Sequence, residues 1–120
     1  RNDATGATAC VPRKELLRTL NGAGTSVYVF RDQELERMVR LIADKLRIHG
    51  CVNFEFIQSD DGSFHFLECN PRFSGGLSFT LDSGYDCVVN HLRCFTGQDI
   101  DEPMNMRVGY IARKYADYLM

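Results

Sequence analysis

"CVNFEFIQSDDGSFHFLECNPRFSGG", residues 51–76, decides the fold, because it joins two runs of β-forming residues through a short polar segment. The runs at 51–58 and 63–69 are rich in Val, Ile and Phe, which favour strands. The "SDDG" between them is typical of a four-residue hairpin loop. We therefore predict an antiparallel hairpin.

The register of this hairpin decides which polar side chains are neighbours. Counting inward from a pair between Gln58 and Ser63 places Asn53 opposite Glu68. Opposed residues share one face of a sheet, with Cβ atoms about 5 Å apart. We therefore expect Asn53 and Glu68 to be neighbours, with Asn70 next along the same face. The same count pairs Ile57 with Phe64, and Glu55 with Phe66.

The end of the second run collects polar groups of a kind that binds metals and phosphates. The carboxylate of Glu68 and the amide oxygens of Asn53 and Asn70 are hard ligands, which suit Mg²⁺ better than zinc or copper. Arg72 is placed to bind a phosphate oxygen, and the backbone N–H groups of residues 74–76 add donors. As residue types alone, they also fit a surface hairpin end with a turn-forming Asn-Pro and a solvated ion pair.

A helix is predicted before the hairpin, at residues 32–48. Its apolar residues recur with helical spacing, Asp32 is a suitable N-cap and Gly50 a suitable stop. Further upstream, "CVPRKELLRTL" and "TSVYVF" predict a strand pair across "NGAG", with a short helix at 13–20 as the alternative.

After the hairpin, the sequence predicts two short helices and a final strand. The helices are "LSFTLDSG" and "DCVVNHLRCFTG", closed by Gly84 and Gly97, and the strand lies around residues 108–112. The expected fold class is therefore α+β, an antiparallel sheet covered by helices.

Composition narrows the functional classes. With 120 residues, 44% of them hydrophobic, residues 1–120 fit a single domain. A net charge of −2 and scattered Lys and Arg argue against nucleic acid as the main partner. Five cysteines without the close pairs of zinc or redox motifs indicate a reduced, cytoplasmic protein. No apolar run approaches the roughly 20 residues of a membrane span, so no membrane is expected as a partner.

The order of a hairpin, "LECNPRFSGG", a helix and the "SGYD" turn resembles the C-terminal half of an ATP-grasp domain. The likeness runs from about residue 27 to residue 97, and it is closest to carbamoyl-phosphate-synthase-like members, whose second strand ends in an E-x-N-P-R-x-S motif. It implies that Glu68 and Asn70 coordinate the magnesium ions that bridge ATP phosphates and that Arg72 contacts the transferred phosphate. Asn53 occupies the position of the third metal ligand, with Glu55 in reserve.

The resemblance also implies a reaction and its cofactors. ATP and Mg²⁺, for which Mn²⁺ can substitute, would phosphorylate a small carboxylate, and an amine, thiol or similar nucleophile would then attack the acyl phosphate. Arg72 would be catalytic, and Ser74 would join Glu68, Asn70 and Arg72 in binding the nucleotide. Arg13 or Arg18 is a further candidate contact for substrate or phosphate.

The adenine-binding hinge, the ATP-contacting lysines and the glycine-rich phosphate loop of this family lie upstream, and 120 residues do not hold them. The chain is therefore expected to be a fragment that is inactive alone. Two other readings stay open: a non-catalytic interaction or regulatory module that keeps the fold, and a metal- or phosphate-binding domain of another fold. Assembly as a homodimer also stays open.

Overall fold

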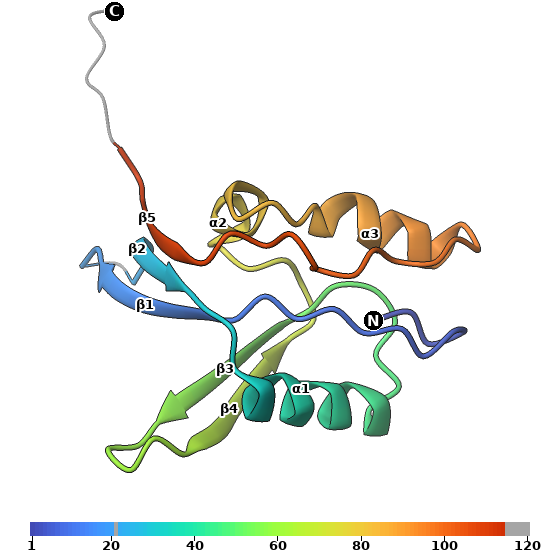
Figure 1. Cartoon of the computed structure of the whole chain (residues 1–120), viewed down its shortest axis with the longest axis horizontal. Helices are drawn as coiled ribbons and strands as arrows, with labels where there is room; N and C mark the ends of the chain where they lie inside the picture. Colours follow the sequence, from blue (N-terminus) through green and yellow to red (C-terminus); the bar gives the residue numbers. More distant parts are fainter. Residues whose placement is uncertain (21, 115–120) are drawn as a thin grey trace, which may run out of the picture.

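The computed structural model describes residues 1–20 and 22–114, and within them the fold is α+β (Figure 1). The strands form two antiparallel sheets, one of three strands in the order β1-β2-β5 and one of the two strands β3 and β4. The elements are β1 (Arg13–Arg18), β2 (Gly24–Val29), α1 (Gln33–Lys45), β3 (Asn53–Gln58), β4 (Phe64–Asn70), α2 (Leu77–Asp82), α3 (Cys87–Phe95) and β5 (Gly109–Ala112).

The three-stranded sheet confirms the predicted strand pair and the final strand, and it excludes the alternative helix at 13–20. Strand β2 pairs with β1 on one side and with β5 on the other. Val27 and Val29 of β2 point to the same face, where Phe79 of α2 covers them and completes the main buried cluster. Burial of each such side chain contributes about 1.5–3 kcal/mol of hydrophobic free energy.

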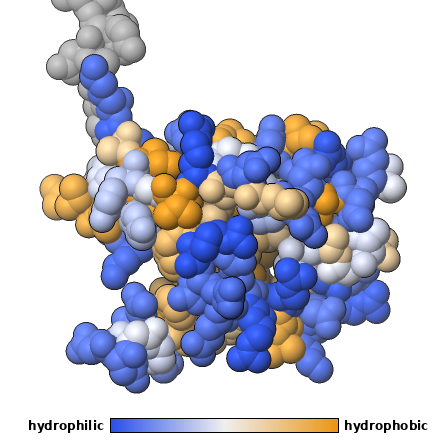
Figure 2. All heavy atoms as spheres, in the orientation of Figure 1, coloured by the Kyte–Doolittle hydropathy of each residue, from blue (hydrophilic) through white to orange (hydrophobic). Residues whose placement is uncertain are grey.

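This core is small, and several large apolar side chains stay in contact with solvent. Leu17 is 66% exposed and Tyr110 is 79% exposed, both on strands of the three-stranded sheet. Figure 2 shows hydrophobic residues gathered at the left of the molecule, near the tips of β1 and β2, and hydrophilic residues over the middle of the same face. The polar surface therefore lies apart from this apolar end.

Strands β3 and β4 form the predicted hairpin, but in a different register. Asn53 pairs with Asn70, Glu55 with Glu68, and Gln58 with Phe64, so the predicted Asn53–Glu68 and Gln58–Ser63 pairs are wrong. One cause lies in the loop, which Ser59 N–H closes by donating to the carbonyl of Ser63 at 2.9 Å, so the loop holds one residue more than predicted.

The second cause is a β-bulge at Leu67. Glu55 faces Glu68 while the next residue, Phe56, faces Phe66, so Leu67 is an extra residue in β4. The predicted pairs Ile57–Phe64 and Glu55–Phe66 are therefore wrong as well. The longer loop places Phe66 on the same face as Phe54 and Phe56, with ring centroids 5.7 and 5.6 Å away, and the bulge brings Glu68 to the opposite face, across from Glu55.

Helix α1 confirms the predicted helix but is shorter. Its N-cap is Asp32, whose side chain accepts from Leu35 N–H at 2.9 Å. It ends at Lys45 rather than near residue 48, because Arg47 adopts a left-handed backbone (φ 51°) and Ile48 N–H donates back to the carbonyl of Ala43. Gly50 is therefore not the stop that the sequence suggested.

The shorter helices α2 and α3 agree with the prediction. Gly84 and Gly97 follow them with φ of 97° and 71°, conformations that glycine adopts without strain. Asp86 caps α3 by accepting from the N–H groups of Val88 and Val89. Figure 1 shows α1 and the hairpin in the lower half of the molecule and α2 and α3 in the upper half, with β1 and β2 between them. No helix in the described ranges is long and apolar enough to cross a bilayer.

Gly50 serves a packing role that leads to a testable prediction. Its φ is 94°, and a Cβ added there would lie 2.6 Å from His91 Nδ1 of α3. Gly62, in the hairpin loop, has a similar φ of 87° but open space around it. We expect Gly62→Ala to lower the free energy of unfolding by about 1–2 kcal/mol, the cost of a left-handed alanine. Gly50→Ala should cost about 1–3 kcal/mol more, from overpacking.

Urea unfolding monitored by circular dichroism measures both variants against the unmodified chain. Equal losses for the two variants would show that His91 does not pack against Gly50 as described.

Candidate functional site

The exposed face of the hairpin carries a compact group of two carboxylates and two amides, which we call the acid–amide cluster: Asn53, Glu55, Glu68 and Asn70. Asn70 Nδ2 donates to Glu68 Oε1 at 2.6 Å and lies 3.5 Å from Glu55 Oε1. Asn53 Nδ2 donates to Glu55 Oε1 at 3.0 Å. The four side chains are therefore in mutual contact across both strands.

All three predicted metal ligands, Asn53, Glu68 and Asn70, lie in this cluster. The reserve candidate Glu55 lies directly opposite Glu68, so it is more central than the sequence suggested. Like charges opposed across two strands destabilise a hairpin. Neither carboxylate forms an ion pair with another residue in the described parts of the chain. The amide groups are their only hydrogen-bonding partners within those parts.

The chemistry of the cluster suits a hard divalent cation. It contains no His or Cys, and within the described residues no group of three or more His, Cys, Asp or Glu side chains is placed to hold a metal. A metal here therefore needs the amides as well as the carboxylates. Rotation of either Asn amide would present Oδ1 instead of Nδ2, which converts a donor into a ligand.

Arg72 follows the cluster at the start of the loop after β4. Its backbone N–H donates to the carbonyl of Asn70 at 2.8 Å, which fixes the turn. Its guanidinium donates to the carbonyl of Phe73 at 3.2 Å and is paired with no carboxylate in the described residues. Most of its donors are thus available to an oxyanion.

The glycine loop, residues 74–76, is only partly open as a donor set. Gly76 N–H, predicted as a phosphate donor, is bound to Ser74 Oγ at 3.0 Å. The N–H groups of Ser74 and Gly75 have no hydrogen-bond partner among the described residues. The hydroxyl of Ser74 therefore shapes the loop, and its neighbouring backbone N–H groups are the free donors.

Two arginines from the three-stranded sheet hold the carbonyl groups of this loop. Arg13 of β1 donates to the carbonyl of Gly76 and, at 2.8 Å, to Thr80 Oγ1. Arg113, after β5, donates to the carbonyl of Gly75 at 2.6 Å, and its guanidinium lies 4.8 Å from the ring centre of Phe79. Burial lowers the pKa of Arg13. The loop is thus fastened by one residue of β1 and one residue after β5.

Two arginines, Arg13 and Arg18, were predicted from the sequence as contacts for substrate or phosphate, and both already have partners within the chain. Arg13 is bound to the loop, and Arg18 is paired with Glu15 at 2.5 Å. Arg113 was missed, because a single arginine after a short strand carries no signal that it reaches a loop 38 residues earlier.

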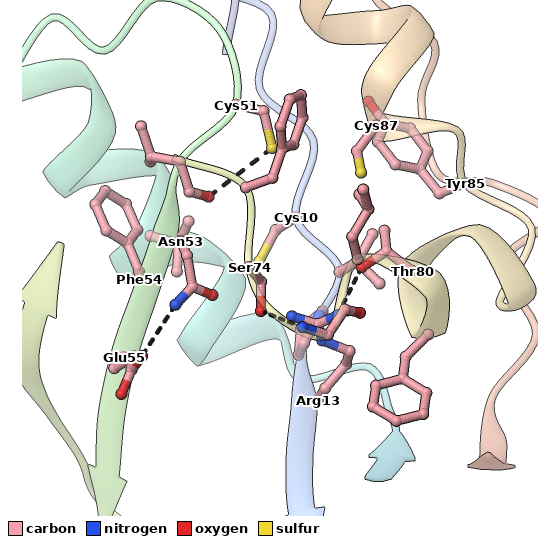
Figure 3. A pocket seen from close by; sticks show the side chains of 18 of the residues that line it. Cys10, Arg13, Cys51, Asn53, Phe54, Glu55, Ser74, Thr80, Tyr85 and Cys87 are labelled. Atoms are coloured by element: carbon pink, nitrogen blue, oxygen red, sulfur yellow. Dashed lines mark hydrogen bonds between the residues drawn. The ribbon is translucent and has the colours of Figure 1, made fainter. Parts of the chain in front are cut away.

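A cavity of about 740 Å³ opens beside the site (Figure 3). Asn53, Glu55, Arg72 and Ser74 are among its lining residues, whereas Glu68 and Asn70 are not. Cys10, Cys51, Tyr85 and Cys87 also line it. A hydrogen bond from Cys87 lowers the pKa of Cys51 to about 7, while burial raises the pKa of Cys10 to about 12 and that of Tyr85 above its usual value.

The role of Arg113 can be tested with a matched variant. Arg113→Gln removes the hydrogen bond to Gly75 and the contact with Phe79, so the amide resonances of Gly75 and Gly76 should shift and unfolding free energy should fall by about 1 kcal/mol. Arg107→Gln is the control, since Arg107 also donates to a backbone carbonyl, that of Asp82. If both variants left the loop resonances in place, Arg113 would have no part in holding the loop.

Comparison with known proteins identifies the family of the chain. Residues 2–117 match the family described as "ATP-grasp in the biosynthetic pathway with Ter operon". Among curated proteins, no match to the chain is found. The family match spans almost the whole chain and contains the hairpin, the acid–amide cluster and the glycine loop. The chain therefore belongs to the ATP-grasp family, whose members are generally ATP-dependent ligases.

Proposed function

We propose that this chain supplies the metal- and phosphate-binding half-site of an ATP- and Mg²⁺-dependent carboxylate ligase that works through an acyl phosphate. The observation that carries the proposal is the pair Glu55–Glu68, flanked by two amides and followed by an arginine without a carboxylate partner. The family membership supplies the ligase class. The specific likeness to carbamoyl-phosphate-synthase-like members rests on the motif "ECNPRFS" alone.

The cluster would hold magnesium through oxygen atoms. Two facing carboxylates carry two negative charges that no described cation neutralises, and Mg²⁺ restores the balance while keeping water and phosphate ligands of its own. Glu68, Asn70 and Asn53 are the proposed ligands, and Glu55 completes the set. Bound there, the metal would neutralise charge on the ATP phosphates during phosphoryl transfer.

Arg72 would stabilise the group being transferred. Its guanidinium follows the metal ligands and lines the cavity, so an oxyanion beside the metal can receive two of its N–H groups. The free N–H groups of Ser74 and Gly75 would donate a second set of hydrogen bonds to the same phosphate. Fixed donors of this kind lower the barrier because they need no reorganisation as charge develops.

The remaining features of the proposal follow from this half-site. The substrate would be a small carboxylate, and the chain on its own would be inactive, because the site described has no identified adenine-binding part. A reducing compartment such as the cytoplasm suits the five free cysteines. The competing function, a non-catalytic module with the same fold, is favoured by Asn53, a weaker ligand than a carboxylate at that position.

A paramagnetic titration tests metal binding directly. Addition of Mn²⁺ to the ¹⁵N-labelled chain should broaden the backbone amides of Asn53, Glu55, Glu68 and Asn70 first, and a non-hydrolysable ATP analogue should strengthen the effect. Glu68→Gln should abolish the selectivity. Asp61→Asn, which removes one charge from the loop of the same hairpin, is the matched control and should leave it intact. Broadening that instead starts at Asp60 and Asp61 would refute the proposed ligand set for this chain.

Charge repulsion within the cluster gives a second test. Without metal, Glu68→Gln should keep or raise the unfolding free energy, by up to about 1 kcal/mol, because the repulsion with Glu55 disappears. With Mg²⁺ at saturating concentration, the unmodified chain should become the more stable of the two, because only the native cluster binds the ion. Thermal unfolding with and without Mg²⁺ measures the crossover. An unchanged order of stabilities would favour the non-catalytic module.

A further inference from the structure

Two cysteines from distant parts of the sequence meet at the edge of the cavity. Cys51 lies just before β3, and Cys87 is the first residue of α3. Cys51 is half-buried and Cys87 is buried. Both cysteines are free, and both line the cavity. The two free thiols thus face the same cavity from distant parts of the sequence.

The backbone around Cys51 is fastened to the same helix. Cys51 N–H donates to His91 Nδ1 at 3.0 Å, and His91 lies one turn after Cys87 on α3. The preceding Gly50 approaches the His91 ring so closely that a Cβ would not fit. These contacts fix the segment against the helix face that carries Cys87. The fold itself therefore holds the two cysteines near each other.

The pair is also open to small molecules. Both residues line the cavity of about 740 Å³, and Figure 3 shows their side chains entering it from different elements. Cys10 and Cys94 also line this cavity, whereas Cys69 does not. Cys94 donates to the carbonyl of Asn90 within its own helix, and Cys69 lies in β4 opposite Phe54. Cys51, the more exposed of the pair, is the thiol that a reagent in the cavity meets first.

We propose that Cys51 and Cys87 form a reversible disulfide when the chain meets a low-molecular-weight disulfide of the glutathione type. The Cys51 thiolate attacks one sulfur of glutathione disulfide, and one glutathione leaves as its thiolate. Cys87, after loss of its proton, attacks Cys51 Sγ of the mixed disulfide, and the second glutathione leaves. Two protein thiols are oxidised and one glutathione disulfide is reduced to two thiols.

The new bond would fasten the start of β3 to the start of α3. It closes a chain segment from 51 to 87 that contains the whole hairpin and the glycine loop. The acid–amide cluster begins two residues after Cys51, so this modification site lies next to the proposed metal site but does not depend on it. The inference stands whether or not the chain binds nucleotide.

Peptide mapping tests the proposal in a Cys69→Ser chain. Trypsin cleavage after Arg47 and Arg72 would otherwise leave Cys51 and Cys69 in one peptide, whereas Cys87 and Cys94 are separated by cleavage after Arg93. The chain is incubated with glutathione disulfide, its remaining thiols are alkylated, and the digest is analysed by mass spectrometry without reduction. We expect the 48–72 peptide joined to the 73–93 peptide, alkylated Cys10 and Cys94, and loss of the cross-link with dithiothreitol.

Single variants test the order of events. Cys87→Ser should stop the reaction at a mixed disulfide between Cys51 and glutathione, while Cys51→Ser should leave Cys87 alkylated. Circular dichroism establishes that each variant is folded, and the mapping in the Cys69→Ser chain stands without them. The proposal is overturned if Cys51 is joined to Cys10 or Cys94, keeps glutathione although Cys87 is present, or is alkylated together with Cys87.

Discussion

The β-bulge at Leu67 is the constraint on which the site depends. Phe66 faces Phe56 in the register set by the loop, and the extra residue that follows it in β4 brings Glu68 and Asn70 to the face of Glu55 and Asn53. Without the extra residue, the same loop would place Leu67 opposite Glu55 and Glu68 opposite Phe54, and the polar group would be broken up. The hairpin thus carries packed aromatic rings on one face and oxygen ligands suited to a metal on the other, because of the bulge.

The elements of the fold could be predicted from the sequence because each has a local signal. Asp32 caps α1, Gly84 and Gly97 follow the shorter helices, and the β-rich runs around "SDDG" form the hairpin. The grouping of the strands into two sheets carried no such signal, since it depends on contacts between β2 and β5 that lie far apart in the sequence.

The errors have definite physical causes. The predicted hairpin register was wrong because two features have no signature in the sequence. These are the longer loop, closed between Ser59 and Ser63, and the bulge. The predicted end of helix α1 was wrong because Arg47, and not a glycine, adopts the left-handed backbone conformation after the helix. The ligand residues still came together, since both shifts move β4 in the same sense and the total of two residues restores the original face. Glu55 was ranked too low for the same reason.

The three-stranded sheet and the hairpin meet at the glycine loop, and this has a mechanical consequence. Arg13 holds Gly76 from one outer strand of the sheet, and Arg113 holds Gly75 from the end of the other. A rotation of the sheet relative to the hairpin would therefore pull on two successive peptide groups at once. A small displacement of β5 would therefore move the loop and change the direction in which the free N–H groups of Ser74 and Gly75 point.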